Sequence, residues 1–233
     1  MAPPAFVRAV AYGIYRGRLR DAIHLLKYDK MHPAARGLGR MLAEAIHLLA
    51  GDAPSDMLVI PVPLHRRKIA QRGFNQAHLL ARQAVAVVKT SHPNWNLKLA
   101  AGVMLRLRAT ETQASLTPRQ RRLNLRGAFA VTDPSAVALK HVLLIDDILT
   151  TGATARAAAT ALMRAGAASV WVATLARARR VHRSPNTRWE DGEIAASSQI
   201  PGRGTAETAG NLSRQEFDSY GTEPISSHGQ PSF

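Results

Sequence analysis

A thirteen-residue segment, VLLIDDILTTGAT at 142–154, restricts the fold more than any other part of the chain. Its first four residues are apolar and predict a buried strand over 141–146, and the turn that follows leads into an Ala-rich helix over 152–164. Asp146 and Asp147 stand at the carboxyl end of this strand, the edge at which open α/β sheets bind ligands. The segment therefore predicts a parallel sheet with a ligand site at that edge.

The turn after the two aspartates has the composition of a phosphate-binding loop. It consists of Thr150, Thr151, Gly152, Ala153 and Thr154. Backbone N–H groups at a helix start attract anions, threonine hydroxyls add donors, and glycine allows close approach. The preceding carboxylates repel phosphate but suit sugar hydroxyls, or a cation carried with the phosphate, so the segment indicates a sugar phosphate site. The alternative is a strand ending in two solvated aspartates before an ordinary Thr-capped helix.

A second segment, IPVPLHRRKIAQRGFNQA at 60–77, follows another short apolar run, which predicts a strand over 57–62. It carries four cations: Arg66, Arg67, Lys68 and Arg72. Arginine suits bidentate phosphate contacts and lysine acts as a point charge, so these residues are suited to a pyrophosphate. The alternative is a basic surface loop, because runs of charge are usually solvated.

The first segment resembles the phosphoribosyl-pyrophosphate (PRPP) binding motif of type I phosphoribosyltransferases. This resemblance implies that Asp146 and Asp147 hold the ribose hydroxyls and that residues 150–154 bind the 5-phosphate. The basic residues of the second segment become the pyrophosphate loop. It also implies that Mg²⁺ enters mainly with PRPP, with Asp146 and Asp147 as the protein ligands.

The polar segment 110–124 matches the position of the lid that such enzymes close over the reacting centre. Its candidate residues are Thr110, Gln113, Arg119 and Arg122. Closure would exclude water from a reactive sugar centre. The alternative is a basic surface loop.

Further strings resemble the ComF/GntX branch of the phosphoribosyltransferases over about residues 10–180. They are YRG at 15–17, LLKY at 25–28, the 60–77 segment, RATETQ at 108–113 and TLAR at 174–177. The resemblance implies an α/β type I phosphoribosyltransferase fold with a mostly parallel sheet, helices on both faces and a small N-terminal helical hood. ComF-like chains usually begin with a Cys-rich zinc module, but this chain has no cysteine. Either this version lacks the module or its start was placed downstream.

We divide the chain into an α/β domain at 51–183, a disordered tail at 184–233 and, as the resemblance implies, a helical hood at 1–50. The tail is rich in Ser, Gly, Thr and Pro and holds three arginines and seven acidic residues. The remaining 183 residues then carry +19 of charge, although the whole chain carries +15. Such a body attracts polyanions, including nucleic acid.

Two functions follow. The first is transfer of the phosphoribosyl group from PRPP to an unidentified nitrogenous base or amine with release of pyrophosphate, linked by the resemblance to competence, DNA uptake or nucleotide salvage. The second is a non-catalytic sensor of PRPP or a nucleotide that binds nucleic acid or a DNA-uptake partner. We expect a cytoplasmic protein, since the chain lacks both a signal-like apolar region and a run of about 18 apolar residues. We also consider a homodimer.

Overall fold

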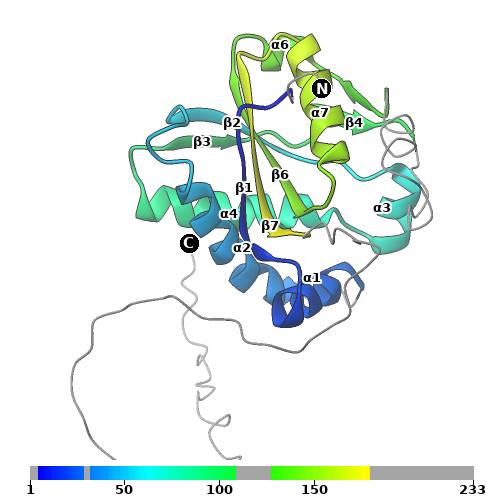
Figure 1. The fold of residues 1–233 in the computed structure, drawn as a ribbon. Helices are drawn as coiled ribbons and strands as arrows, with labels where there is room; N and C mark the ends of the chain where they lie inside the picture. The colour runs from blue at the N-terminus through cyan, green and yellow to red at the C-terminus, as the bar shows by residue number, and fades with distance from the viewer. Residues whose placement is uncertain (1–4, 29–31, 109–126, 179–233) are drawn as a thin grey trace, which may run out of the picture. The chain divides into compact units, whose positions relative to one another are not determined.

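The computed structural model describes residues 5–28, 32–108 and 127–178. Within them a five-stranded sheet has the order β1-β7-β6-β2-β3, and every neighbouring pair of its strands is parallel (Figure 1). The strands are β1 (Ala9–Ile14), β2 (Asp56–Pro61), β3 (Asn96–Leu99), β6 (His141–Leu149) and β7 (Ser169–Arg177). The parallel α/β sheet expected from the sequence is confirmed.

Helices cover both faces of this sheet, because its central strands are apolar on both sides. In β6, Leu143 and Ile145 pack in the core formed with α1, α2 and α4. Val142 and Leu144 pack in a second core with α7. The helices are α1 (Gly17–Tyr28), α2 (His32–His47), α4 (Gln76–Ser91), α6 (Pro134–Val137) and α7 (Ala153–Arg164).

The N-terminal region, which we expected to be helical, contains a strand before its two helices. The strand β1 joins the main sheet beside β7, so residues 1–50 are not solely a helical hood. Its periodicity is weak because it lies at the sheet edge: Val10 is buried but Tyr12 and Ile14 are exposed. The pairing of this strand places it within the α/β sheet, and the division of the chain with a hood at 1–50 stays a prediction.

The basic segment after β2 is helical, where we expected a loop. Helix α3 (Arg66–Arg72) begins after His65, whose side chain accepts a hydrogen bond from the Arg67 N–H, and it ends at Gly73 with a φ of 81°. A separate antiparallel hairpin pairs β4 (Met104–Arg106) with β5 (Phe129–Val131).

The strand β6 is longer than expected and continues through both aspartates to Leu149. Strand β2 pairs with it only as far as Ile145, whereas β7 pairs with it from His141 to Leu149. The aspartates therefore lie where β6 loses one neighbour, which leaves room for other groups beside them.

The predicted tail at 184–233 and the segment 110–124 lie outside the described residues. Among the described residues, none of the helices combines the length and the apolar character that crossing a bilayer requires.

Candidate functional site

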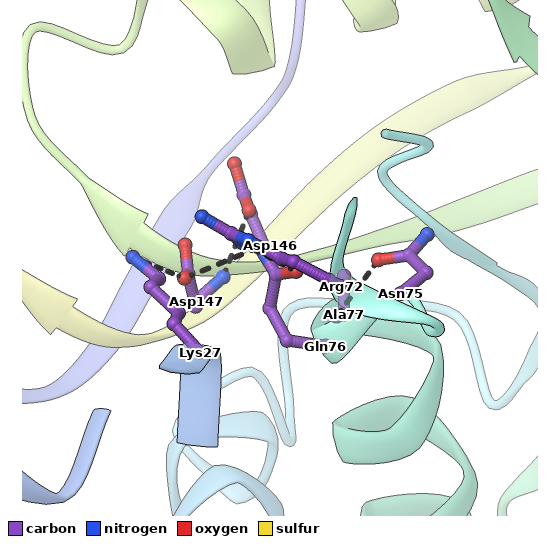
Figure 2. A network of polar contacts seen from close by, with 7 residues as sticks. All are labelled: Lys27, Arg72, Asn75, Gln76, Ala77, Asp146 and Asp147. Carbon is purple, nitrogen blue, oxygen red and sulfur yellow. Dashed lines mark hydrogen bonds and ion pairs between the residues drawn. The ribbon is translucent and has the colours of Figure 1, made fainter. Parts of the chain in front are cut away.

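The side chain of Asp147 lies between two helices at the end of the sheet (Figure 2). The Lys27 ammonium, in the last turn of α1, is 2.6 Å from Asp147 Oδ2. The Gln76 amide, at the start of α4, donates to the same oxygen over 3.4 Å. Asp147 is buried, with 6% of its surface exposed. The ion pair with Lys27 and the hydrogen bond from Gln76 fix the position of this carboxylate.

Gln76 is itself held by the segment that follows α3. Arg72 Nη1 donates to Gln76 Oε1 over 3.1 Å. The neighbouring Asn75 side chain donates to the Val62 carbonyl over 3.0 Å and accepts from the Ala77 N–H over 3.0 Å, which caps α4. This network ties the basic segment to the carboxylate pair of β6, as Figure 2 shows.

Asp146 is only partly exposed and lies against its neighbour. Its Oδ1 accepts the backbone N–H of Asp147 over 2.9 Å. Burial raises the pKa of Asp146 to about 8, and repulsion from the Asp147 carboxylate adds to this effect. The two carboxylates therefore differ: Asp147 has a cation as partner, while Asp146 favours its neutral form until a ligand changes its surroundings.

Basic side chains from three elements surround the aspartates. Burial lowers the pKa of Lys68, and repulsion from Arg106, Arg72 and Lys27 lowers it further, while Asp147 opposes the shift. Burial also lowers the pKa of Arg106, and attraction to Asp146 opposes it. The Arg106 guanidinium lies 5.4 Å from the centre of the Phe129 ring. Four cations beside two carboxylates make this region attractive to anions.

The structure separates the four cations predicted on the 60–77 segment. Lys68 and Arg72 are partly buried and belong to the charged cluster, while Arg66 and Arg67 are exposed. Arg66 lines a cavity of about 490 Å³ between α3 and β4, together with Asn75 and Arg106. The aspartates are not part of that cavity's lining, so the cavity lies beside the carboxylates and not over them.

The turn between β6 and α7 has the backbone that its sequence predicts. Gly152 has a φ of 72° and stands at the N-cap position of α7. The Ala153 N–H donates to Thr151 Oγ1 over 3.4 Å, and Arg156 Nη2 donates to the Thr151 carbonyl over 2.8 Å. Arg156 also lines a second cavity, of about 510 Å³, against α7. The turn directly follows the aspartates, as a sugar phosphate site requires.

Three residues of this cluster were not among the predicted site residues: Lys27, Gln76 and Arg106. Lys27 and Gln76 lie in strings that carry the family resemblance, but their contacts with Asp147 join distant parts of the chain. Arg106 carried a readable signal, since an arginine within a short apolar strand needs a reason to be buried. The lid candidates Thr110, Gln113, Arg119 and Arg122 lie outside the described residues.

The described residues contain no group of three or more His, Asp, Glu or Cys side chains placed to hold a metal ion. The protein part of a metal site in this region would therefore be small. It would consist of one or both aspartates, with the remaining ligands supplied by a substrate or by water.

Comparisons with known proteins give one matching family model and several curated relatives. A family model described as a phosphoribosyl transferase domain matches residues 69–193. The DNA utilization protein YhgH of Escherichia coli strain K12 is 36% identical over 178 residues, which cover 75% of this chain and 74% of that protein. Competence protein F of Haemophilus influenzae is 30% identical over 182 residues, with 75% of each chain covered. Competence protein ComFC of Bacillus subtilis is 31% identical over 182 residues, with 70% of each covered.

Proposed function

Because the chain belongs to the ComF family of phosphoribosyltransferase-like proteins, we propose that it binds PRPP at the aspartate pair of β6 and transfers the phosphoribosyl group. The acceptor is a nitrogenous base or an amine, and pyrophosphate is the second product. The observation that carries this proposal is the order of groups along one edge of the sheet. Two carboxylates on β6 are followed at once by the Thr-Gly turn into α7, and Lys68, Arg72 and Arg106 lie beside them.

Each part of this edge suits one part of the substrate. The carboxylates of Asp146 and Asp147 accept hydrogen bonds from the ribose hydroxyls. The Thr150–Thr154 turn donates backbone N–H groups and hydroxyls to the 5-phosphate. Lys68 and Arg72 lie on the side of α3 and bind the pyrophosphate, with a smaller contribution from the exposed Arg66 and Arg67.

The reaction breaks the bond between the sugar's anomeric carbon and pyrophosphate and forms a bond from that carbon to the acceptor nitrogen. The acceptor loses a proton to solvent or to a substrate oxygen. Positive charge that develops on the sugar is stabilised by the two adjacent carboxylates. Negative charge on the leaving pyrophosphate is stabilised by the cations of α3 and by Arg106. Both sets of groups are positioned before the reaction, and such preorganisation is the condition for electrostatic catalysis.

Mg²⁺ fits this site as an ion that arrives with the substrate. Asp147 already has Lys27 as its partner, so Asp146 is the better protein ligand, and phosphate oxygens complete the set. When bound, the ion would neutralise phosphate charge and favour departure of pyrophosphate.

The names of the relatives indicate a biological setting. They are described as DNA utilization and competence proteins, and we propose that this protein serves the use of imported DNA or nucleotide salvage. The second candidate is a non-catalytic PRPP or nucleotide sensor that binds nucleic acid, which is favoured by the +19 charge of the first 183 residues. Cytoplasmic location and a homodimer remain predictions.

Pyrophosphate release distinguishes the two candidates. The purified protein is incubated with PRPP, Mg²⁺ and a panel of bases and amines, and pyrophosphate is measured with a coupled assay. Acceptor-dependent release by the wild type, lost in Asp146→Asn/Asp147→Asn, supports the transferase. Asp56→Asn is the matched control, because Asp56 is exposed at the amino end of β2. PRPP binding without release under any acceptor would support the sensor.

A further inference from the structure

The helix α1 places Lys27 in the charged cluster, although α1 lies far from Asp146 and Asp147 in sequence. Lys27 lies in the last turn of α1, its side chain is 17% exposed, and its ammonium is 2.6 Å from Asp147 Oδ2. Within the described part of the chain, Asp147 is the one group that Lys27 pairs with directly, and the charge of Lys27 also acts on Asp146. An ammonium carries three donors, so the ion pair leaves donors for another group.

The cations of this cluster outnumber its carboxylates: Lys27, Lys68, Arg72 and Arg106 lie beside Asp146 and Asp147. Lys27 and Lys68 are close enough to repel one another, and Lys68 is also repelled by Arg72 and Arg106. Asp147 attracts Lys68 as well as Lys27, so the two lysines share this counterion. Cations gathered in a partly buried place need a compensating anion, and a bound ligand with several negative oxygens would supply it.

A purely structural role explains this arrangement poorly. A buried ion pair gives little net stability relative to an apolar pair of similar volume, because both groups must lose water. The burial of Lys27 and Asp147 is better explained by a ligand that binds one or both of these side chains.

We propose that Lys27 is a substrate-contacting residue for the pyrophosphate group of a sugar 1-diphosphate, which completes the anion site from the α1 side. The inference rests on the proposed function. In the free protein Asp147 holds the Lys27 ammonium. When the ribose hydroxyls bind Asp147, the ammonium turns to the pyrophosphate oxygens, opposite Lys68 and Arg72. Substrate binding therefore couples α1 to the carboxylate pair.

The test compares three ligands by isothermal titration calorimetry with Mg²⁺ present: PRPP, inorganic pyrophosphate and ribose 5-phosphate. Lys27→Met should weaken PRPP and pyrophosphate binding about tenfold or more, the effect of one charge-assisted hydrogen bond. Ribose 5-phosphate lacks the pyrophosphate, so its affinity should change by less than about threefold. Lys27→Arg should retain most of the pyrophosphate affinity. Lys98→Met is the matched control, since Lys98 forms an exposed pair with Asp56 on β3 and β2.

Lys27→Met leaves Asp147 buried without its cation, and this alone can disturb the fold. The double variant Lys27→Met/Asp147→Asn removes both charges and keeps the volume. Direct contact predicts that this variant still binds pyrophosphate about tenfold more weakly than the wild type. Wild-type pyrophosphate affinity in the double variant would overturn the inference while leaving the proposed function intact. A wild type that binds none of the three ligands would overturn the proposed function itself.

Discussion

The side-chain amide of Gln76, the first residue of α4, donates to Asp147 Oδ2 over 3.4 Å, although the two residues are 71 positions apart. The same side chain accepts from Arg72, so one glutamine connects the cations of α3 to the carboxylates of β6. The two segments that carry the family resemblance therefore form one network. The positions of Arg72 and Asp147 in the proposed substrate site therefore depend on Gln76, which carries no charge.

Gln76→Leu should weaken PRPP binding about three- to tenfold, because it removes one hydrogen bond to Asp147 and one to Arg72. The side-chain volume is nearly conserved, so the free energy of unfolding should change less than the affinity. Calorimetric titration with PRPP and Mg²⁺ measures the effect. Gln71→Leu, at an exposed position of α3, is the control. Equal affinities of the two variants would contradict a role for Gln76 in ordering the site.

The cations of α3 should contribute unequally. Arg72 is partly buried and bonded to Gln76, whereas Arg67 is exposed on the same helix. Arg72→Met should weaken pyrophosphate binding about tenfold, since it removes both a charge and a contact that orders Gln76. Arg67→Met should weaken it by about threefold or less and should lose most of that effect in 0.5 M salt, where exposed charges are screened. A larger loss from Arg67→Met would show that the exposed arginine is the main ligand.

A substitution at Gly152 tests whether the turn at 150–154 binds the 5-phosphate. Its φ of 72° disfavours any side chain, and an added Cβ would lie 3.4 Å from Arg156 Nη2. Gly152→Ala should lower the free energy of unfolding by about 1–2 kcal/mol and weaken ribose 5-phosphate binding. Urea denaturation and titration measure the two effects. Gly37→Ala is the control, because Gly37 lies in α2 with no atom near its added Cβ and should gain roughly 0.5–1 kcal/mol. Unchanged ribose 5-phosphate affinity in Gly152→Ala would argue against the turn as its site.

Asp146 should make stability depend on pH in the absence of ligand and Mg²⁺. Burial and then repulsion from Asp147 raise its pKa to about 8 in the folded protein, while an unfolded aspartate titrates near pH 4, roughly. Between these values the unfolded state releases the proton and the folded state keeps it. The contribution of Asp146 to stability is therefore present below about pH 4 and is lost as the pH rises toward about 8.

Asp146→Asn cannot titrate at this position. Its free energy of unfolding, minus that of the wild type, should therefore grow from pH 4 to pH 8 and then level off. Urea denaturation at fixed pH values measures this difference. A difference that stays constant with pH would contradict the raised pKa of Asp146.

The sequence predicted the parallel sheet and the helix after β6 because the apolar patterns of these elements are local. The continuous apolar run at 142–145 predicts a buried strand. The Thr-Gly turn that comes later in the segment predicts the start of a helix. The strand β1 was not predicted because an edge strand buries only some of its residues. Gly13 further weakens its alternation of apolar and polar residues. Helix α3 escaped because four charges in seven residues resemble a solvated loop.

The aspartate pair and the phosphate turn were predictable because they are adjacent in sequence. The contacts of Asp147 were not, because Lys27 and Gln76 reach it only when α1 and α4 pack against the same face of β6. No local pattern records which of two neighbouring carboxylates receives a cation. That difference between Asp146 and Asp147 exists only in the folded chain.

Binding of PRPP to the aspartate pair is the central claim, and one calorimetric experiment tests it most directly. Wild type, Asp146→Asn/Asp147→Asn and the control Asp56→Asn are titrated with PRPP in the presence of Mg²⁺. We predict saturable one-to-one binding by the wild type and the control, and at least tenfold weaker binding by the double variant. Equal affinity in all three proteins, or no binding by the wild type, would contradict the account.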